Sequence, residues 1–441
     1  MPPRFHASLS LTAEPKVAGV VRYLPLAAAG KDEPEHAHIN LVLSFTNGLG
    51  HNVRVRKITL SVPDIAQSEL SFTVNVFIAS GTTASWTQTD DYVVETASVQ
   101  WLHIKVEGEE PSWTSEFTFA MAPHVSPGPG GCYQFWARAD DLRANEFWYV
   151  NGTKHSQDNP AQLFAYDVGV GAPASTDPWF SLLLPGTDGS MNEHYRIWGK
   201  PIYAIGDGKV VAFRNDQATN AVPFQIDLQL QDYWSSLASV TDGNGNFFCI
   251  TGGGETVLYA HMQPGTLNRT LLQDNADVKA GDFLGLAGNS GASSNPHMHI
   301  HAVAAGSHLN PWQGDLRPLL FQNLQTVAYS AITGSGNVAS APWSAIENRG
   351  FAFGDCAVWP LASAPEPRAP CVPRYFALGR EGQLWIIHAD GAIDGTIRTT
   401  SARMPSRGAY MGFDPGGEAR HIAVSGAQPY IIGSDEYVRE G

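Results

Sequence analysis

Alternating apolar and polar residues fill much of the first 175 positions of the chain. The pattern is regular over residues 53–62, 70–79 and 99–106, and it recurs over residues 39–45, 116–122 and 132–138. Alternation of this kind places one apolar face on each strand, and Gly, Pro, Asp and Ser lie between the segments. We therefore expect an antiparallel, immunoglobulin-like β-sandwich of roughly seven strands over residues 1–175, with a binding or packing role.

Small residues at positions 169–178 suggest a linker, and the pattern changes after them. Residues 200–213 are interpreted as two strands joined by an Asp-Gly turn, and residues 278–288 as a second strand–turn–strand unit. Strands are also predicted over residues 246–251 and 255–261, on either side of three glycines. No helix is needed between Lys200 and Val303.

A second stretch of small and polar residues, 330–342, precedes a proline-rich region. Residues 375–391 then read as a hairpin, and residues 429–441 resemble it loosely. We predict an all-β chain in three parts: the sandwich over 1–175, a central β domain over 176–325, and a small β-rich C-terminal module of unknown role over 326–441.

Composition and charge exclude several classes of partner. The 441 residues are 43% hydrophobic and carry a formal net charge of −15 without a basic run, so nucleic acid and anionic membrane surfaces are not expected partners. No apolar run approaches the roughly 18 residues of a membrane span. The first residues lack the apolar core of a usual signal peptide, and localisation is left open.

Three histidines at every second position follow a glycine-rich turn. His297, His299 and His301 would project from one face of a single strand. Three imidazoles suit neither an apolar core nor a solvent surface, whereas neutral imidazole is a common zinc ligand. The spacing therefore favours a metal site over a set of solvated histidines.

The central block resembles the lysostaphin-type zinc endopeptidases, which cut peptide cross-links in bacterial cell walls. The resemblance covers roughly residues 180–320 and rests on an ordered series of short motifs. These are GKPIYA (199–204), DGKVV (207–211), YAHM (259–262), VKAGD (278–282), GLAGNSGAS (285–293), PHMH (296–299) and LNP (309–311).

The resemblance implies one Zn²⁺ ion in an antiparallel sheet, held by two histidines and one aspartate, with water completing the site. It makes His299 a metal ligand, and it places His261 and His297 beside the water as catalytic residues. Zinc lowers the pKa of bound water and polarises the scissile carbonyl, and a nearby imidazole can accept the proton. His301 lies where the family has another residue; we expect it to be a solvated bystander, and the alternative is a group that supports a metal ligand.

One motif of the family is missing. The family has His-x-x-x-Asp upstream of the GKPIYA-like segment, and residues 185–201 contain no such pattern. Asp188 together with His194 is the first choice for the remaining ligands, and Glu193 is the second. The third possibility is that no intact metal site exists.

The predicted function is zinc-dependent cleavage of peptide cross-links or stem peptides of peptidoglycan. The alternative is a catalytically degenerate relative that binds cell wall or protein, because the His-x-x-x-Asp motif is absent. A third possibility is a zinc peptidase for other peptides. The insertion between Phe213 and Phe247 is expected to be a variable surface loop, with a lid as the alternative.

Overall fold

The computed structural model describes most of the chain, and it confirms the all-β fold class. The described residues are 9–28, 34–63, 65–96, 98–109, 112–151, 162–174, 180–223, 243–306, 315–333, 337–351 and 356–361, together with the backbone of seven strands between 373 and 440. The chain divides into two compact units, Met1–Ala362 and Ser363–Gly441. Within the described part, no helix combines the length and the hydropathy that a membrane span requires.

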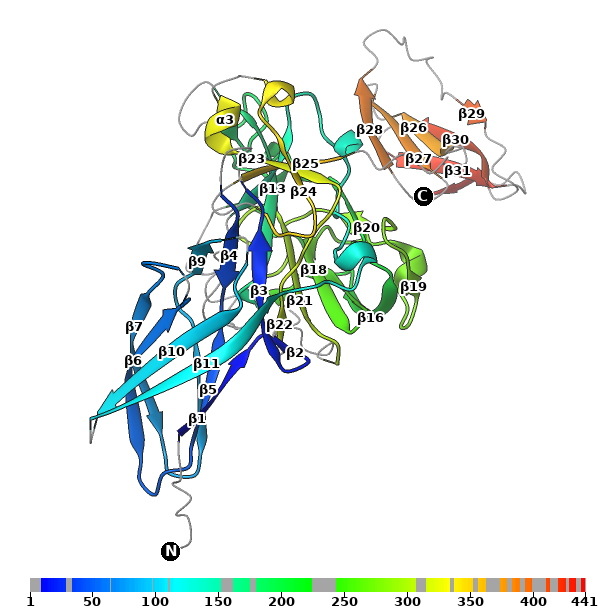
Figure 1. Cartoon of the computed structure of the whole chain (residues 1–441). Helices are drawn as coiled ribbons and strands as arrows, with labels where there is room; N and C mark the ends of the chain where they lie inside the picture. The colour runs from blue at the N-terminus through cyan, green and yellow to red at the C-terminus, as the bar shows by residue number, and fades with distance from the viewer. Residues whose placement is uncertain are drawn as a thin grey trace, which may run out of the picture. The chain divides into compact units, whose positions relative to one another are not determined.

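The first part of unit 1 contains a three-stranded and an eight-stranded sheet (Figure 1). The smaller sheet has the order β1 (Leu9–Glu14), β5 (Val42–Asn47), β8 (Thr83–Thr87). The larger has the order β7 (Leu70–Ile78), β6 (Val53–Ser61), β10 (Trp101–Glu109), β11 (Trp113–Pro123), β3 (Val20–Leu26), β4 (His36–Ile39), β9 (Tyr92–Glu95), with β2 (Lys16–Val17) beside β3.

A shared core joins these two sheets. Leu43 and Phe45 of the small sheet and Ile58 and Ile104 of the large sheet are fully buried in one cluster. The alternation predicted for β6, β7 and β10 is present, and β10 buries Leu102, Ile104 and Val106 from every second position. Burying each such side chain contributes about 1.5–3 kcal/mol. One pairing, β11 with β3, is parallel, so the sandwich is not antiparallel throughout.

Residues 132–138, predicted as a strand, do not form one. The segment makes a single bridge, from Tyr133 to Phe321, while Cys132, Phe135 and Trp136 are buried in the large core of unit 1. Its apolar residues therefore reflect a buried irregular segment, which periodicity cannot separate from a short strand.

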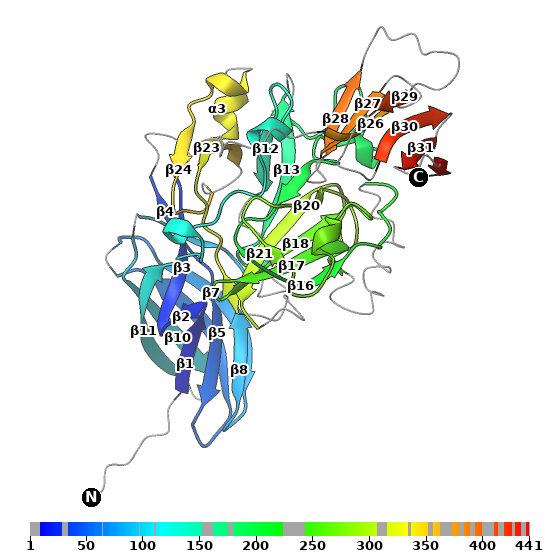
Figure 2. The same cartoon turned by 90° about the vertical axis from the view of Figure 1, so that its right-hand side faces the viewer.

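A twelve-stranded sheet forms the centre of unit 1, and Figure 2 shows β16, β17, β18 and β21 side by side in it. Its order is β19 (Asp277–Val278), β16 (Gly208–Arg214), β17 (Asn246–Gly252), β18 (Glu255–Met262), β21 (Met298–Ala304), β13 (Tyr166–Pro173), β12 (Phe147–Asn151), β25 (Cys356–Pro360), β23 (Leu324–Ala328), β24 (Ser344–Ile346). Two short strands lie off this path, β14 (Phe180–Ser181) on β13 and β22 (Leu316–Arg317) on β21.

The two predicted hairpins of the central block exchange partners. β15 (Pro201–Tyr203) pairs with β20 (Phe283–Leu286) in a separate two-stranded sheet, while β16 pairs with β17 and β19. The Asp207 carboxylate fixes this arrangement, because it accepts hydrogen bonds from the Lys279 ammonium and the Ala280 amide. Long-range pairing thus overrides the local Asp-Gly signal. By contrast, β17 and β18 pair as adjacent strands around the glycine turn.

The first predicted linker overlaps β13, which crosses the middle of the sheet. Its glycines have a packing function, because a Cβ on Gly171 would lie 3.0 Å from the rings of Phe147 and Phe180. Glycine in a strand often marks such a close approach. The second predicted linker also holds ordered elements, α3 (Tyr329–Thr333) and the 3-10 turn η7 (Val338–Ser340), with Tyr329, Ile332 and Val338 in a small core.

Strands from both sides of positions 175 and 325 share the central sheet, and the three-part division of the chain stays a prediction. Unit 2 contains two sheets, β26 (Pro373–Leu378), β27 (Gln383–His388), β28 (Ile393–Arg398) and β29 (Tyr410–Gly412), β30 (Ala419–Ser425), β31 (Gln428–Gly433), β32 (Val438–Glu440). The predicted hairpin at 375–391 corresponds to the antiparallel pair β26 and β27.

Candidate metal and catalytic site

β21 carries the histidine series through the middle of the sheet. Met298, Ile300 and Ala302 point to the large apolar core, and His299 and His301 alternate with them on the opposite face. Both imidazoles are about 1% exposed, and His299 Nε2 lies 2.9 Å from His301 Nδ1. The expectation that His301 is solvated is therefore wrong: the neighbouring strands bury it against His299.

Asp167 on β13 reaches the same histidines from the adjacent strand. It is directly opposite His299 in the antiparallel register, and its Oδ1 atom lies 2.9 Å from His299 Nδ1 and 3.5 Å from His297 Nε2. Asp167 is not among the predicted site residues, because the small residues from 169 onward resemble a linker. The available signal was a lone carboxylate within an otherwise apolar segment, residues 163–170.

The sandwich helps to place the segment before Asp167. The amide of Asn40, which follows β4, donates a buried hydrogen bond to the Leu163 carbonyl at 3.0 Å. Nearby, the His38 ring meets Phe164 edge-on with centroids 5.4 Å apart. Asp91 accepts from Asn40 and pairs with His38, so one buried network holds the approach to β13.

His261 lies at the end of β18, which borders β21 on the side away from β13. Its ring centroid is 4.8 Å from that of His297 and 5.8 Å from that of His299. Its backbone φ is +67°, a left-handed conformation that is uncommon for a residue other than glycine and costs about 1–3 kcal/mol. Such strain persists where the surroundings impose it, and it is frequent at active sites.

The tautomer of His261 follows from its surroundings. Nδ1 lies 2.8 Å from the Ser290 carbonyl, which can only accept, so Nδ1 carries the proton and Nε2 keeps its lone pair when the ring is neutral. Burial lowers the pKa of His261 well below its ordinary value, and the neighbouring rings of His297 and His299 lower it further. The ring therefore has a basic nitrogen available at neutral pH.

The glycine-rich turn needs its glycines to pass beneath His261. A Cβ on Gly288 would lie 2.5 Å from the backbone nitrogen of Gln263. Gly291 has φ +75°, and a Cβ there would collide in the same way with the backbone of Gly245. Ser290 ties the turn to β18, because its hydroxyl donates to the Met262 carbonyl and accepts from the Asn246 amide N–H.

His297 lies between the turn and Asp167. Its Nδ1 lies 2.8 Å from the Asn295 carbonyl, so Nδ1–H donates there and Nε2 faces the Asp167 carboxylate. In the neutral ring Nε2 is an acceptor, and the two acceptors would face each other at 3.5 Å. A cation bound between them, whether a proton or a metal ion, would satisfy both.

The donor set around Asp167 fits zinc in its chemistry. Zinc holds histidine nitrogen and carboxylate oxygen at about 2.0–2.2 Å, so neighbouring ligand atoms of a tetrahedral site lie about 3.3 Å apart. The two distances from Asp167 Oδ1, 2.9 and 3.5 Å, bracket that value. Among the described residues, which omit 152–161 and 224–242, no group of three or more potential ligands is assembled for an ion.

Asp188 and His194, predicted as ligands, pair with each other instead of joining the histidines. Asp188 Oδ1 lies 3.1 Å from His194 Nδ1, and the Asp188 side chain is 76% exposed. Hydrogen bonds from the Ser190 hydroxyl and amide lower the Asp188 pKa. His194 and Glu193 belong to the 3-10 turn η4 (Asn192–His194), and Asn192 fixes this turn beside the glycine-rich one by accepting from Asn289. Their role as metal ligands stays a prediction.

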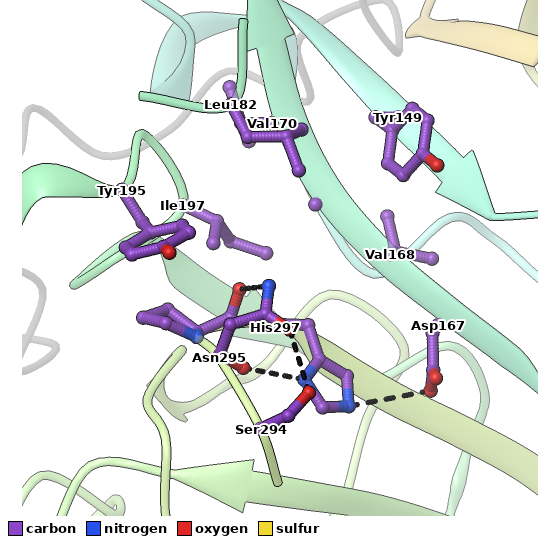
Figure 3. Close-up of a pocket in the computed structure, with 12 residues that line it drawn as sticks. Tyr149, Asp167, Val168, Val170, Leu182, Tyr195, Ile197, Ser294, Asn295 and His297 are labelled. Atoms are coloured by element: carbon purple, nitrogen blue, oxygen red, sulfur yellow. Dashed lines mark hydrogen bonds and ion pairs between the residues drawn. The ribbon is translucent and has the colours of Figure 1, made fainter. Parts of the chain in front are cut away.

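A cavity of about 330 Å³ opens beside the cluster (Figure 3). Asp167 and His297 lie at one side of it, and the labelled apolar side chains lie around the rest. The insertion between Phe213 and Phe247, predicted as a variable surface loop with a lid as the alternative, lies outside the described residues over 224–242, and so does the LNP motif.

The comparisons with known proteins agree with the motif series. Residues 194–311 match the model of Peptidase family M23, which confirms the resemblance to lysostaphin-type peptidases for this part of the chain. The match contains His194, His261, His297 and His299, and it begins 27 residues after Asp167 (194 − 167). In a comparison with curated protein sequences, no protein matches the chain significantly.

Solved structures with detectable likeness include several peptidases. They include a zinc-containing peptidase from Vibrio cholerae (12% identity, TM-score 0.21, 64% of this chain and 57% of that one) and the antimicrobial peptidase lysostaphin from Staphylococcus simulans (12%, 0.23, 69% and 89%). A putative peptidase M23 from Pseudomonas aeruginosa has 15% identity and a TM-score of 0.18, and the match covers 48% of this chain and 72% of that one. The chain thus spans less than two thirds of the Vibrio protein, and at these TM-scores the likeness does not bear on function.

Proposed function

We propose that this chain is a zinc-dependent endopeptidase that hydrolyses peptide bonds in peptidoglycan. The observation that carries the proposal is the convergence of His261, His297, His299 and Asp167, from three adjacent strands and one turn, on one small region. The match of residues 194–311 to Peptidase family M23 supports a peptidase.

Asp167 and His299 would hold the ion, since their oxygen and nitrogen atoms face each other at ligand-like distance. The bound ion would supply Lewis acidity to the scissile carbonyl and acidify a water molecule. His194, with Asp188 as its partner, remains the proposed source of the further histidine ligand.

The remaining chemistry belongs to His261 and His297. The Ser290 carbonyl fixes the Nδ1 proton of His261, so its Nε2 can accept the proton of the attacking water. The Asn295 carbonyl orients the His297 ring in the same way. His261 would then return that proton to the leaving amine, and His297, when its ring carries a proton on both nitrogens, would stabilise the oxyanion.

Zinc content and wall hydrolysis together test the proposal. We expect about one zinc per wild-type chain after dialysis, with loss in His299→Ala and Asp167→Asn. We also expect zinc-dependent release of free amino groups from purified peptidoglycan. A His194→Ala variant reports separately on the predicted first-motif ligand, because it should lose zinc only if His194 is a ligand. Wild-type protein that takes up no zinc even after reloading would overturn the proposal.

A non-catalytic wall-binding role is the second candidate, and the missing His-x-x-x-Asp motif favours it. In that case peptidoglycan binding would survive both chelation and His297→Ala, and no amino groups would be released. Zinc-dependent hydrolysis by the wild-type protein would exclude this role.

A further inference from the structure

The cavity beside the histidine cluster is lined by four segments: β12, β13, residues 182–197 and residues 294–297. Tyr149 of β12 and Val168 and Val170 of β13 form one wall. Leu182 and Ile197, from the segment that follows β13, also line the cavity, and Figure 3 shows Leu182 beside Val170 and Ile197 beside Tyr195. At about 330 Å³ the cavity is at the lower end of the range for small-molecule sites, so it suits one side chain of a larger ligand.

The chemistry of the walls favours an apolar occupant. Of the twelve residues that line the cavity, only Asp167 and His297 can carry charge, and both also belong to the catalytic cluster. None of the twelve is Lys or Arg, so a carboxylate side chain would find no permanently cationic partner there, and the Asp167 carboxylate would repel it. Burying an apolar side chain there would instead contribute about 25 cal/mol per Å² of surface removed from water.

Buried polar contacts fix the segment that carries Leu182 and Ile197. The backbone of Arg196 donates to the Leu182 carbonyl, and the guanidinium donates to Ser181 and to the fully buried Glu146. Lys200 also pairs with Glu146, so this carboxylate anchors the segment that carries Ile197. On β13, Gly169 contributes no side chain and leaves the space between Tyr149 and Leu182 open.

We propose that this cavity is a specificity subsite that receives a bulky apolar side chain of the peptide next to the cleaved bond. The inference rests on the proposed peptidase function and adds a substrate class to it. Because Asp167 and His297 form one edge, a side chain in the cavity would place its own peptide group at the catalytic cluster. Peptides with leucine or phenylalanine beside the scissile bond should therefore be preferred over glycine peptides.

Two series of fluorogenic peptides test the preference, with Gly, Ala, Leu or Phe varied on one side of the cleaved bond or the other. In one series we expect kcat/KM to rise at least about tenfold from Gly to Leu or Phe, since apolar pockets discriminate about 10- to 200-fold per methylene group. Equal values for Gly, Leu and Phe in both series, with cleavage intact, would overturn the subsite and leave the peptidase function standing.

Leu182→Trp fills the cavity from one wall. It should lower kcat/KM for the Leu and Phe peptides about tenfold and leave the Gly peptide unchanged. Met191→Trp is the matched control, because Met191 is 49% exposed and does not line the cavity. Gly169→Ala is the milder variant if Leu182→Trp fails to fold, because its added methyl would lie 3.5 Å from Tyr149 and 3.7 Å from Leu182, at ordinary contact distance. An equal loss for every peptide would contradict the proposal.

Binding without catalysis gives an independent result. N-acetyl-leucine amide and N-acetyl-glycine amide can be titrated into the chelator-treated full-length protein and followed by NMR. The leucine compound should bind more tightly, and Leu182→Trp should remove the difference. If no peptide is cleaved but this difference is present, the peptidase function fails and the subsite stands. If neither compound binds, or both bind alike, the subsite is refuted whatever the activity.

Discussion

Asp167 Oδ1 lies 2.9 Å from His299 Nδ1, although 132 residues separate the two in the sequence. The pair is directly opposed across β13 and β21, so the contact follows from strand register and not from a flexible loop. The proposed ligand pair therefore stands on two central strands, which hold side chains more firmly than loops do.

Removing the charge of Asp167 should weaken zinc binding. Asp167→Asn keeps the shape of the side chain but loses the anionic oxygen, so we expect zinc affinity to fall at least about tenfold in competition with a chromophoric chelator. Asp277→Asn is the control, because Asp277 is 81% exposed and pairs only with surface lysine in the described structure. Equal affinities in all three proteins would show that Asp167 is not a ligand.

His301 should act on zinc through His299. The His299–His301 contact of 2.9 Å fixes the orientation of the His299 ring, and loss of such a partner commonly costs 10- to 100-fold in metal affinity. We expect this loss in His301→Ala and partial recovery in His301→Asn, whose amide can occupy the position of Nδ1. His103→Ala, at an exposed position of β10, should change nothing.

Thermal unfolding in chelator separates this effect from simple destabilisation. If His301→Ala lowers Tm but binds zinc with wild-type affinity, then His301 is a packing residue and does not position the ligand.

His261 should affect turnover without affecting zinc. Asn tolerates the left-handed φ of +67° at this position, so His261→Asn removes the imidazole with the least backbone strain. We expect kcat to fall about 10²- to 10⁴-fold, as is typical for loss of a general base, while zinc content stays near that of the wild type. Loss of zinc in this variant would instead identify His261 as a ligand.

The stability of unit 1 should depend on the protonation of Asp141. Burial raises the pKa of its carboxyl to about 6, against 3.8 in the unfolded chain, although the Arg138 amide and nearby cations oppose the shift. The folded protein therefore binds this proton more tightly than the unfolded chain. This contribution to stability is complete below about pH 4 and is lost as the pH rises through 6.

Asp141→Asn should remove that dependence while still accepting the hydrogen bond from the Arg138 amide. Relative to the wild type, its free energy of unfolding should rise between pH 4 and pH 7, by up to about 3 kcal/mol. Urea denaturation at several pH values measures the difference. A constant difference across this range would show that Asp141 is ionised in the fold at acid pH.

Local sequence patterns predicted the strands and the site histidines, but they did not predict which strands pair or which side chains contact the histidines. His261, His297 and His299 were selected from local motifs, and the structure brings them together because β18 and β21 are neighbours. Asp167 was not predicted as a site residue because glycines and an alanine follow it in the sequence. Those residues resemble a linker locally, whereas the fold needs them small so that Phe147 and Phe180 can approach β13.

The pairing of the strands could not be predicted from local sequence either. The Asp-Gly signal at 207–208 predicts a hairpin, but β15 and β16 join different sheets. β15 pairs with β20 and β16 pairs with β19, which come just after and just before residue 280. Likewise, a histidine three positions into an alternating strand gives no sign of whether its face is covered. For His301, only the tertiary packing of the neighbouring strands decides this.

The position of β13 has a practical consequence for anyone who expresses part of this protein. A fragment cut to the M23 match, residues 194–311, would contain β21 without β13, one of the two strands that border it. The main-chain donors and acceptors of β21 that bond to β13 would be unpaired along a newly created sheet edge. Such edges recruit other chains into aggregates. Insolubility of that fragment would then reflect where it was cut, and its failure to bind metal would say nothing about the intact protein.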